Sequence, residues 1–262
     1  MIYIILGIVG IYIVSGFTLM LFQERLIFLD DELSELYQFD FPVPFEELNL
    51  EVADTARLNG IHFKTENAKG LIIYYHGNSG NLERWGNEVQ YFVKLNYDVV
   101  VMDYRGYGKS QGKRTMKILL EDAQLFYDYG KGHFEEENIT LYGRSLGTGI
   151  VTHVASNNKP KQLILETPYY DFRSIVQRFY PIFPVGISLK YNFKTNEYIQ
   201  EVDCPIYIFH GTSDDVVPYE SGKKLHESVE EGQSTLITIK DGEHKDLIKF
   251  EEFRNRMEEV LR

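Results

Sequence analysis

The chain has 262 residues, of which 44% are apolar and 25% are charged, a composition typical of a globular protein with room for one large α/β domain. The chain has 27 Lys and Arg residues and 39 Asp and Glu residues, so its net charge is −12. Because the sequence also contains no cluster of basic residues, it excludes electrostatic binding of nucleic acid. Cys204 is the one cysteine, so the sequence predicts neither a disulfide framework nor a zinc module, and no other metal is implied.

The first 22 residues form an apolar segment without a charged side chain. As a helix rising ~1.5 Å per residue, this segment matches the ~30 Å hydrocarbon core of a bilayer. A cleaved signal peptide is one alternative, but it favours an early positive charge and small residues at its end, whereas the first basic residue is Arg25 and residues 19–22 are bulky. A buried helix is the other alternative. The sequence predicts a single-pass, uncleaved membrane anchor over residues 1–22.

Residues 23–45 begin with an acidic stretch and end in a segment stiffened by Pro42 and Pro44, which indicates a juxtamembrane linker. Alternating apolar and polar residues in 47–52 and 61–64 then predict two half-exposed antiparallel strands. Short continuous apolar runs predict strands buried on both faces. These runs are 71–75, 99–102, 139–142, 163–165, 206–209 and 236–239.

Amphipathic stretches separate or follow these strands and predict helices. They are residues 82–95, 115–129, 146–157, 218–230 and 246–262. Because strands alternate with helices, we expect residues 46–262 to form one α/β domain, with a mostly parallel sheet covered by helices on both faces. Residues 169–200 separate two strands by more than an ordinary crossover and are rich in Tyr, Phe and Pro. This interval predicts a lid or binding element, and an extra helix pair that completes the core is the alternative.

A candidate nucleophile lies between a predicted strand and a predicted helix, where residues 143–147 read Gly-Arg-Ser-Leu-Gly. A strand that turns sharply into a helix forces its apex residue into a positive-φ conformation, and small neighbours are needed because backbones approach closely there. The turn exposes the hydroxyl of Ser145 at the helix N-terminus, and the N–H of Leu146 points toward a developing oxyanion.

The same Gly-x-Ser-x-Gly pattern occurs at residues 108–112, around Ser110. That segment lies well past its strand and leads into polar residues, so we expect Ser145 rather than Ser110 to be the nucleophile. Residues 108–110 also read Gly-Lys-Ser, the end of a phosphate-binding loop, but that loop requires glycine at position 103, where the chain has Asp103.

A reactive serine needs a histidine base and a carboxylate that orients the base. The carboxylate candidates Asp214 and Asp215 follow the strand 206–209, and His244 follows the strand 236–239. Because the ends of parallel strands share one edge of a sheet, we expect Ser145, an aspartate and His244 to meet there. Asp171 is a further rival for the acid.

The loop after the first buried strand reads His-Gly-Asn-Ser-Gly-Asn over residues 76–81. The second donor of an oxyanion hole usually comes from this place, and Gly77 lets the backbone turn inward. We therefore expect the N–H of Asn78 to be that donor, against the alternative of a plain glycine-rich turn. His76 and His210 each precede a glycine just after a strand, and we interpret both as residues that shape loops.

With these motifs in their order along nearly the whole chain, the sequence resembles the alpha/beta-hydrolase superfamily. It is most similar to the membrane-anchored alpha/beta-hydrolase-domain group related to serine aminopeptidases and to small lipid or acyl-protein esterases. The matching pieces include residues 23–28, 76–78, 103–110, 143–147, 210–214 and 242–244. The resemblance implies that Asp214, two residues after Thr212, is the acid, and that residues 103–110 form a structural loop behind the site. Residues 166–168 (Glu-Thr-Pro) depart from the family's usual serine-bearing segment.

The sequence therefore predicts a serine hydrolase that cleaves an ester or thioester of an acyl or lipid-like substrate, with no cofactor. An aminopeptidase-like amidase is the second hypothesis, although we find no charged anchor for a peptide terminus. A non-catalytic scaffold that binds a lipid or a partner at the membrane is the third.

Overall fold

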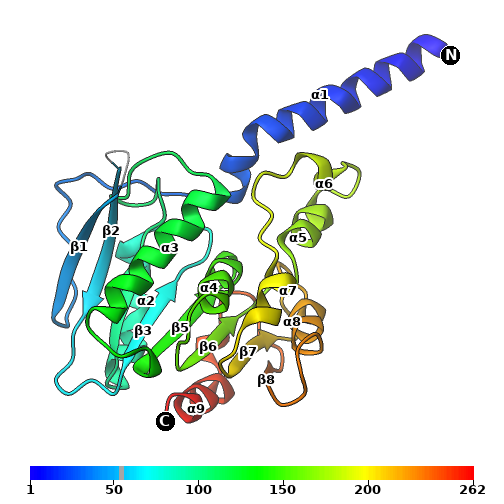
Figure 1. Ribbon diagram of the computed structural model, residues 1–262. Helices are drawn as coiled ribbons and strands as arrows, with labels where there is room; N and C mark the ends of the chain where they lie inside the picture. Colours follow the sequence, from blue (N-terminus) through cyan, green and yellow to red (C-terminus); the bar gives the residue numbers. More distant parts are fainter. Residues whose placement is uncertain (53–55) are drawn as a thin grey trace.

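The computed structural model describes residues 1–52 and 56–262 (Figure 1). Within them, an eight-stranded sheet has the order β1-β2-β4-β3-β5-β6-β7-β8. The strands are β1 Phe45–Val52, β2 Ala56–Phe63, β3 Leu71–Tyr75, β4 Asp98–Met102, β5 Ile139–Arg144, β6 Gln162–Glu166, β7 Ile206–Gly211 and β8 Ser234–Ile239. β1, β2 and β4 pair antiparallel and all later neighbours pair parallel, which confirms the predicted mostly parallel sheet.

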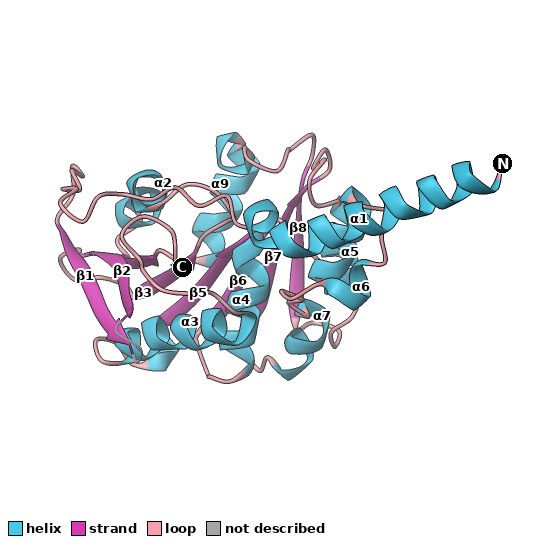
Figure 2. Ribbon diagram, turned by 90° about the horizontal axis from the view of Figure 1, so that it is seen from above, coloured by secondary structure: helices cyan, strands magenta, loops and turns pink. Residues whose placement is uncertain are grey.

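Helices cover both faces of this sheet, as predicted. Figure 2 shows α2 and α9 on one face and α3 and α4 on the other. The longer helices are α1 Ile2–Ile27, α2 Leu82–Lys94, α3 Met116–Lys131, α4 Leu146–Ser156, α5 Phe172–Phe179, α8 Tyr219–His226 and α9 Glu251–Val260. Shorter ones are α6 Val185–Ser188, α7 Thr195–Tyr198 and the 3-10 turns Glu136–Asn138, Ile199–Glu201 and Leu247–Lys249. The predicted helix over 246–262 is thus split, because Phe250 is extended between its two parts.

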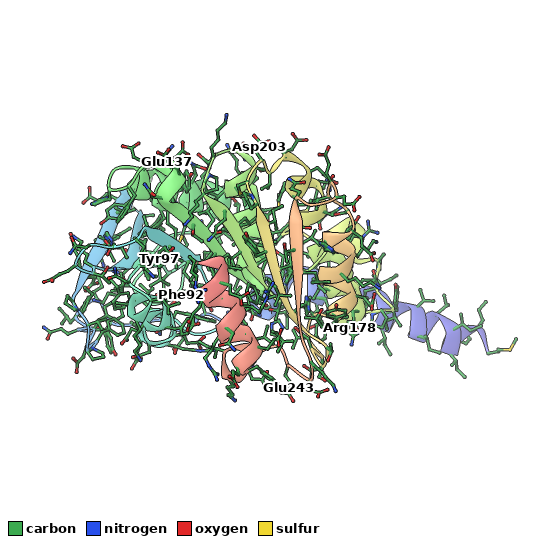
Figure 3. All side chains as sticks on the ribbon, turned by 90° about the horizontal axis from the view of Figure 1, so that it is seen from below. Phe92, Tyr97, Glu137, Arg178, Asp203 and Glu243 are labelled. Atoms are coloured by element: carbon green, nitrogen blue, oxygen red, sulfur yellow. The ribbon has the colours of Figure 1, made fainter. Side chains whose placement is uncertain are left out.

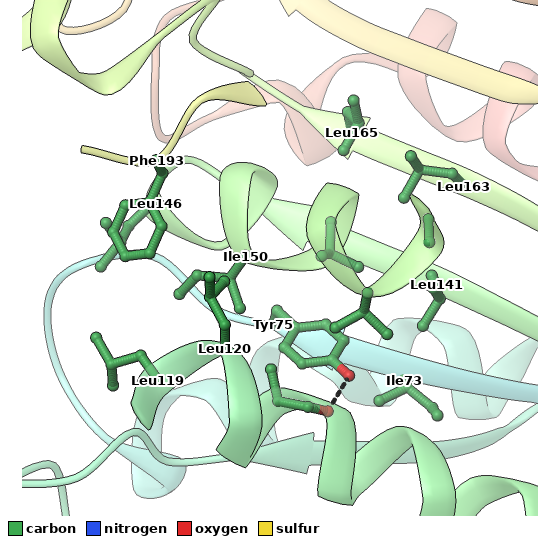
Figure 4. Close-up of a cluster of buried hydrophobic side chains, with 14 of the residues drawn as sticks. Ile73, Tyr75, Leu119, Leu120, Leu141, Leu146, Ile150, Leu163, Leu165 and Phe193 are labelled. Carbon is green, nitrogen blue, oxygen red and sulfur yellow. Dashed lines mark hydrogen bonds between the residues drawn. The ribbon is translucent and has the colours of Figure 1, made fainter. Parts of the chain in front are cut away.

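The two core clusters follow from this layering. On the α3 and α4 face, Leu119 and Ile150 belong to the same buried cluster as the alternate residues Ile73 and Tyr75 of β3 (Figure 4). The Tyr75 hydroxyl is buried there and donates to the carbonyl of Ala123 at 2.8 Å. On the opposite face, α2 and α9 contribute the second cluster, and Figure 3 shows Phe92 and Tyr97 beside α9. A sheet buried on both faces positions the ends of its strands rigidly.

β2 differs from the prediction of a half-exposed strand, which was wrong for this element. Ile61, His62 and Phe63 are all buried. One face of β2 packs under Phe39 and Phe41, and on the other face His62 lies 2.9 Å from the Tyr129 hydroxyl of α3. The alternation of residues therefore marks two different contact surfaces and not one solvent face.

The segment predicted as a juxtamembrane linker packs against the domain. α1 continues past the expected boundary at residue 22 and ends at Ile27. Residues 28–44 then pass the loops after β3 and β4, where Leu29 pairs with Ser79 and Glu32 with Gly108, and Phe28, Phe39 and Phe41 are buried. Because these aromatic rings belong to the two core clusters, the end of α1 is held close to the domain.

The interval 169–200 divides into two parts. Tyr191 and Phe193 are buried in the larger core cluster, together with Ile199 just after α7. α5 and α6 instead lie beside the base of α1 (Figure 1). Phe172 and Ile175 of α5 belong to the same core cluster, so both parts of the interval contribute to the core, and the lid role stays a prediction.

Candidate active site

Ser145 occupies the sharp turn between β5 and α4. Its φ of 50° and ψ of −114° are the strained, positive-φ backbone that the sequence predicts. A Cβ at Gly143 would lie 2.8 Å from the carbonyl oxygen of Gly147, and a Cβ at Gly147 would collide with the backbone at the end of β3. Both glycines are therefore required by close packing, and the turn holds the serine hydroxyl at the edge of the sheet.

Three side chains from three strand ends meet at this turn. His244 Nε2 lies 2.9 Å from Ser145 Oγ, and His244 Nδ1 lies 2.8 Å from Asp214 Oδ2. β5, β7 and β8 run parallel, so the residues that follow them share one edge of the sheet. The structure thus brings together the three residues that the sequence selects, in a continuous chain of hydrogen bonds.

Asp214 is buried and has several hydrogen-bond donors. Its Oδ1 accepts from the N–H groups of Val216 at 3.0 Å and Val217 at 2.8 Å. Burial by itself would raise the pKa of this carboxyl, but hydrogen bonds from His210 and His244 and from the Val217 N–H outweigh burial and lower the pKa to about 2. A carboxylate that is ionised at neutral pH favours the tautomer of His244 with its proton on Nδ1, which leaves Nε2 free to accept a proton from the serine.

Asn78 and Leu146 lie beside Ser145 around one cavity. Leu146 is the first residue of α4, and the N–H groups of a first helical turn have no acceptor within the helix. The Asn78 carbonyl accepts from the Tyr107 hydroxyl at 2.8 Å and from the Leu29 N–H at 2.8 Å, so the loop after β3 is held in place. This arrangement suits two backbone donors aimed at one oxyanion.

The cavity in front of Ser145 has a volume of about 600 Å³. Its walls come from α1, from α5 and α6, and from the loops after β3, β5, β6 and β7. Of the described residues that line it, none carries a charge. Within the part of the chain that the structure describes, no three His, Cys, Asp or Glu side chains gather as a metal site.

The rival residues have other partners. Ser110 is buried, donates to the Asp103 carbonyl at 2.7 Å and accepts from the Asn59 N–H at 2.8 Å. The Asp171 carboxylate caps the N-terminus of α5 through the Ser174 N–H at 2.8 Å. Asp215 is exposed.

His76 and His210 lie under the two functional loops. His76 Nδ1 lies 2.6 Å from the Gly77 carbonyl, its Nε2 lies 3.2 Å from Asp103 Oδ1, and its own carbonyl accepts from the Tyr104 hydroxyl at 2.9 Å. His210 Nε2 donates to the Val217 carbonyl at 2.9 Å and lies 3.5 Å from Asp214. Each histidine thus supports the loop that follows its strand, in line with the loop-shaping role expected of it.

An ion cluster around the buried Arg144, next to the nucleophile, is not apparent from the sequence. The Arg144 guanidinium lies 2.5 Å from Glu88 and 3.3 Å from Glu166, and the Glu166 backbone carbonyl accepts the Ser145 N–H at 3.0 Å. Glu166 belongs to the segment that departs from the family's usual pattern. An arginine directly before the serine and a glutamate at a strand end are the two signals in the sequence, but only the pairing of β5 with β6 brings them together.

Comparison with known proteins gives a family and related sequences. The family described as "Serine aminopeptidase, S33" matches residues 66–196, half of the chain. The "Lysophosphatidylserine lipase ABHD12" of Danio rerio is 32% identical over 186 residues, which cover 63% of this chain and 48% of that protein. The chain therefore spans about half the length of the ABHD12 relatives. The "Uncharacterized protein YfhR" of Escherichia coli K12 is 28% identical over 216 residues, which cover 78% of this chain and 75% of that protein.

Solved structures share the fold. The Pyrococcus furiosus esterase Pf2001 superimposes with a TM-score of 0.69 at 17% identity, covering 89% of this chain and 98% of the esterase. An acetyl xylan esterase from Paenibacillus superimposes with a TM-score of 0.68 at 18% identity, covering 85% of this chain and 86% of that enzyme. The family match and this shared architecture show that the chain belongs to the α/β-hydrolase superfamily, as a serine hydrolase of the family described as serine aminopeptidases.

Proposed function

We propose that this protein hydrolyses a carboxylic ester or thioester of a lipid-like molecule with one acyl chain, through an acyl-enzyme on Ser145. One observation carries the proposal. The hydrogen-bonded chain of Ser145, His244 and Asp214 opens into an uncharged, largely apolar cavity. The hydrogen bonds explain why the Ser145 hydroxyl would be reactive, and the apolar cavity explains why the bound group would be an acyl chain.

In the proposed reaction, Ser145 Oγ attacks the acyl carbonyl while His244 Nε2 takes the hydroxyl proton. The N–H groups of Asn78 and Leu146 donate to the oxyanion of the tetrahedral intermediate. When the intermediate collapses, the bond to the leaving group breaks and His244 gives its proton to the departing alkoxide or thiolate. Water, deprotonated by His244, then attacks the acyl-enzyme. The second tetrahedral intermediate releases the acid as its bond to Ser145 Oγ breaks and His244 returns the proton to Oγ. Asp214 stays ionised and stabilises the imidazolium in both steps.

The lipid character of the substrate has two supports. Burying an acyl chain in an apolar cavity is favourable by ~0.8 kcal/mol for each methylene removed from water. Several of the related sequences are lysophosphatidylserine lipases, and lysophosphatidylserine is a lipid with one acyl chain. We therefore propose a lysophospholipid or another monoacyl ester as the substrate class.

Amide cleavage is the second candidate, because the matching family is described as a serine aminopeptidase. An aminopeptidase must bind the charged ammonium group of a peptide, and a carboxylate in the site is the usual partner for that charge. The described lining residues of the cavity include no carboxylate. This observation favours the ester.

Two measurements test the proposal. A fluorophosphonate probe is expected to label the wild-type protein and not Ser145→Ala, and absence of labelling of the wild type would favour a non-catalytic scaffold. Hydrolysis of p-nitrophenyl esters with acyl chains of increasing length is then compared with hydrolysis of aminoacyl anilides. We expect faster ester turnover with medium or long chains. Faster anilide turnover would assign the protein as an amidase.

We further propose that residues 1–22 anchor the protein as a single membrane span. α1 has 26 residues, and residues 2–14 are exposed on all sides, although most are large and apolar. Exposure of such an apolar helix is favourable in the lipid bilayer and unfavourable in water. Retention of the full-length chain in the membrane fraction after alkaline carbonate extraction is the expected result. A soluble mature chain that lacks residues 1–22 would instead identify a signal peptide.

A further inference from the structure

One face of α1 forms a wall of the cavity that contains Ser145. The lining positions of the helix recur every three or four residues, so they share one face. They include Tyr12, Gly16, Met20, Gln23 and Ile27. Residues 12–22 therefore belong both to the proposed membrane anchor and to the wall of the substrate cavity.

Specific contacts hold α1 against the segment that covers the site. The Tyr12 ring stacks on Phe183 with 5.3 Å between centroids, and the Tyr12 hydroxyl donates to the Ile182 carbonyl at 2.8 Å. A Cβ at Gly16 would lie 3.3 Å from the Phe183 ring, so glycine allows this close approach. Farther along, Gln23 Oε1 accepts from the Lys190 N–H at 2.8 Å. These contacts define a fixed wall.

The end of α1 also contacts the loop of the proposed oxyanion donor. The Asn78 side-chain amide donates to the Ile27 carbonyl at 3.1 Å, and the Leu29 N–H donates to the Asn78 carbonyl at 2.8 Å. α1 thus borders the cavity from its lid side to the residue beside Ser145. Beyond this part, the helix projects away from the domain (Figure 1), and its first half is exposed.

We propose that the C-terminal half of α1 is an acyl-binding and specificity-determining element, and that the substrate enters from the bilayer along this helix. The inference rests on the proposed function and adds the element that selects the acyl chain. The apolar surface is continuous from the lipid-exposed first half of α1 to the cavity wall, so an acyl chain that follows the helix stays out of water. Since the wall is fixed, the side chains that project from α1 limit the length of chain that fits.

Met20 offers a direct test because it lines the cavity and is half-buried. The full-length protein is reconstituted in phosphatidylcholine vesicles, and rates are measured for p-nitrophenyl esters of 4 to 16 carbons. Met20→Trp narrows the cavity and is expected to lower the ratio of long-chain to short-chain kcat/KM at least tenfold. Met20→Ala enlarges the cavity and is expected to shift the preferred chain to greater length.

Leu21 supplies the matched control. It neighbours Met20 on the same helix, is 55% exposed, and is not among the described residues that line the cavity. Leu21→Trp and Leu21→Ala change side-chain size equally within the membrane segment, and we expect both to keep the wild-type chain-length profile. Equal profiles for the wild type and both Met20 variants would overturn the inference, as would the same shift in the Leu21 variants.

A second readout separates this inference from the proposed function. Alkyl fluorophosphonates of several chain lengths report access of a chain to Ser145 without any ester turnover. If the wild type turns over esters but labelling and rates in the Met20 variants keep the wild-type dependence on chain length, α1 is no specificity element and the esterase proposal stands. If no ester is hydrolysed but labelling shifts with Met20 as described, the cavity wall stands and the substrate class is wrong. Absence of both labelling and turnover overturns both.

Discussion

Two segments of this chain have the same Gly-x-Ser-x-Gly pattern and opposite environments. Residues 143–147 turn directly from β5 into α4, and Ser145 is partly exposed with its hydroxyl 2.9 Å from His244. Residues 108–112 belong to the loop between β4 and α3, and the Ser110 hydroxyl is buried between the Asp103 carbonyl and the Asn59 N–H. The hydroxyl of Ser110 fastens a loop to β2, whereas that of Ser145 faces the cavity.

The difference shows what the pattern itself specifies. In both segments the glycines relieve close backbone contacts or positive φ angles, as at Gly147 and Gly108. Glycine spacing therefore indicates a tight turn. Reactivity depends on a helix that begins at the next residue and on a histidine that reaches the apex, and neither is part of the pattern.

The largest effect should come from the proposed nucleophile. We expect Ser145→Ala to lower kcat for p-nitrophenyl esters by about 10³–10⁶-fold, because the acyl-enzyme no longer forms. His244→Ala should lie in the same range. A loss of less than tenfold in kcat for Ser145→Ala would contradict the assignment of Ser145 as the nucleophile.

The glycine after the nucleophile provides the next test. Gly147→Ala introduces a methyl group that would collide with the backbone at the end of β3, so we expect a loss of roughly 3 kcal/mol in unfolding free energy. Ester turnover should fall as well, because the displaced helix N-terminus carries the Leu146 donor. Denaturant unfolding in detergent measures the first effect. Wild-type stability for this variant would show that the turn relaxes freely.

The contributions of Asp214, next to His244, and of Asp103, next to Ser110, to the free energy of unfolding should change in opposite directions as pH falls. Asp214 has a pKa lowered to about 2, so its ionised form contributes stability that is complete above its ordinary pKa of 3.8 and is lost as pH falls toward 2. We expect the stability difference between wild type and Asp214→Asn to shrink by about 2 kcal/mol over that range.

Asp103, beside Ser110, is the internal comparison for this pH dependence. Burial raises its pKa although His76 Nε2 lies 3.2 Å from its Oδ1. The folded state therefore holds a proton on Asp103 more tightly than the unfolded state does, and the difference between wild type and Asp103→Asn should move the other way as pH falls. Parallel changes for the two variants would contradict the assigned environments.

The smallest effect on activity is expected at Ser110. Ser110→Ala leaves the Asn59 N–H and the Asp103 carbonyl without their hydroxyl partner, which should cost about 1–2 kcal/mol of stability. kcat should stay within a few-fold of wild type, because Ser110 is not among the described residues that line the cavity. A loss similar to that of Ser145→Ala would mean that the pattern at 108–112 was misinterpreted.

Much of the site follows from local sequence. The order of strands and helices predicts which residues end a strand, and strand ends of a parallel sheet share an edge. Ser145, His244 and one of the pair Asp214 and Asp215 could therefore be chosen as candidates that meet, and the family resemblance selected Asp214 from that pair. The environment of β2 was not predictable in this way, because Phe39 and Phe41 reach it from a segment without regular structure. The pairing of Arg144 with Glu88 likewise joins residues far apart in the chain.

The sequence by itself determined the alternation of elements, the turn at Ser145 and the apolar first helix, because hydrophobic periodicity and glycine placement act over a few residues. Only the tertiary structure decided that the Ser110 hydroxyl is buried and hydrogen-bonded between a loop and β2, and that one face of α1 borders the cavity. These outcomes depend on contacts between distant segments, such as Tyr12 with Phe183, and a local pattern carries no information about which distant surface will cover it.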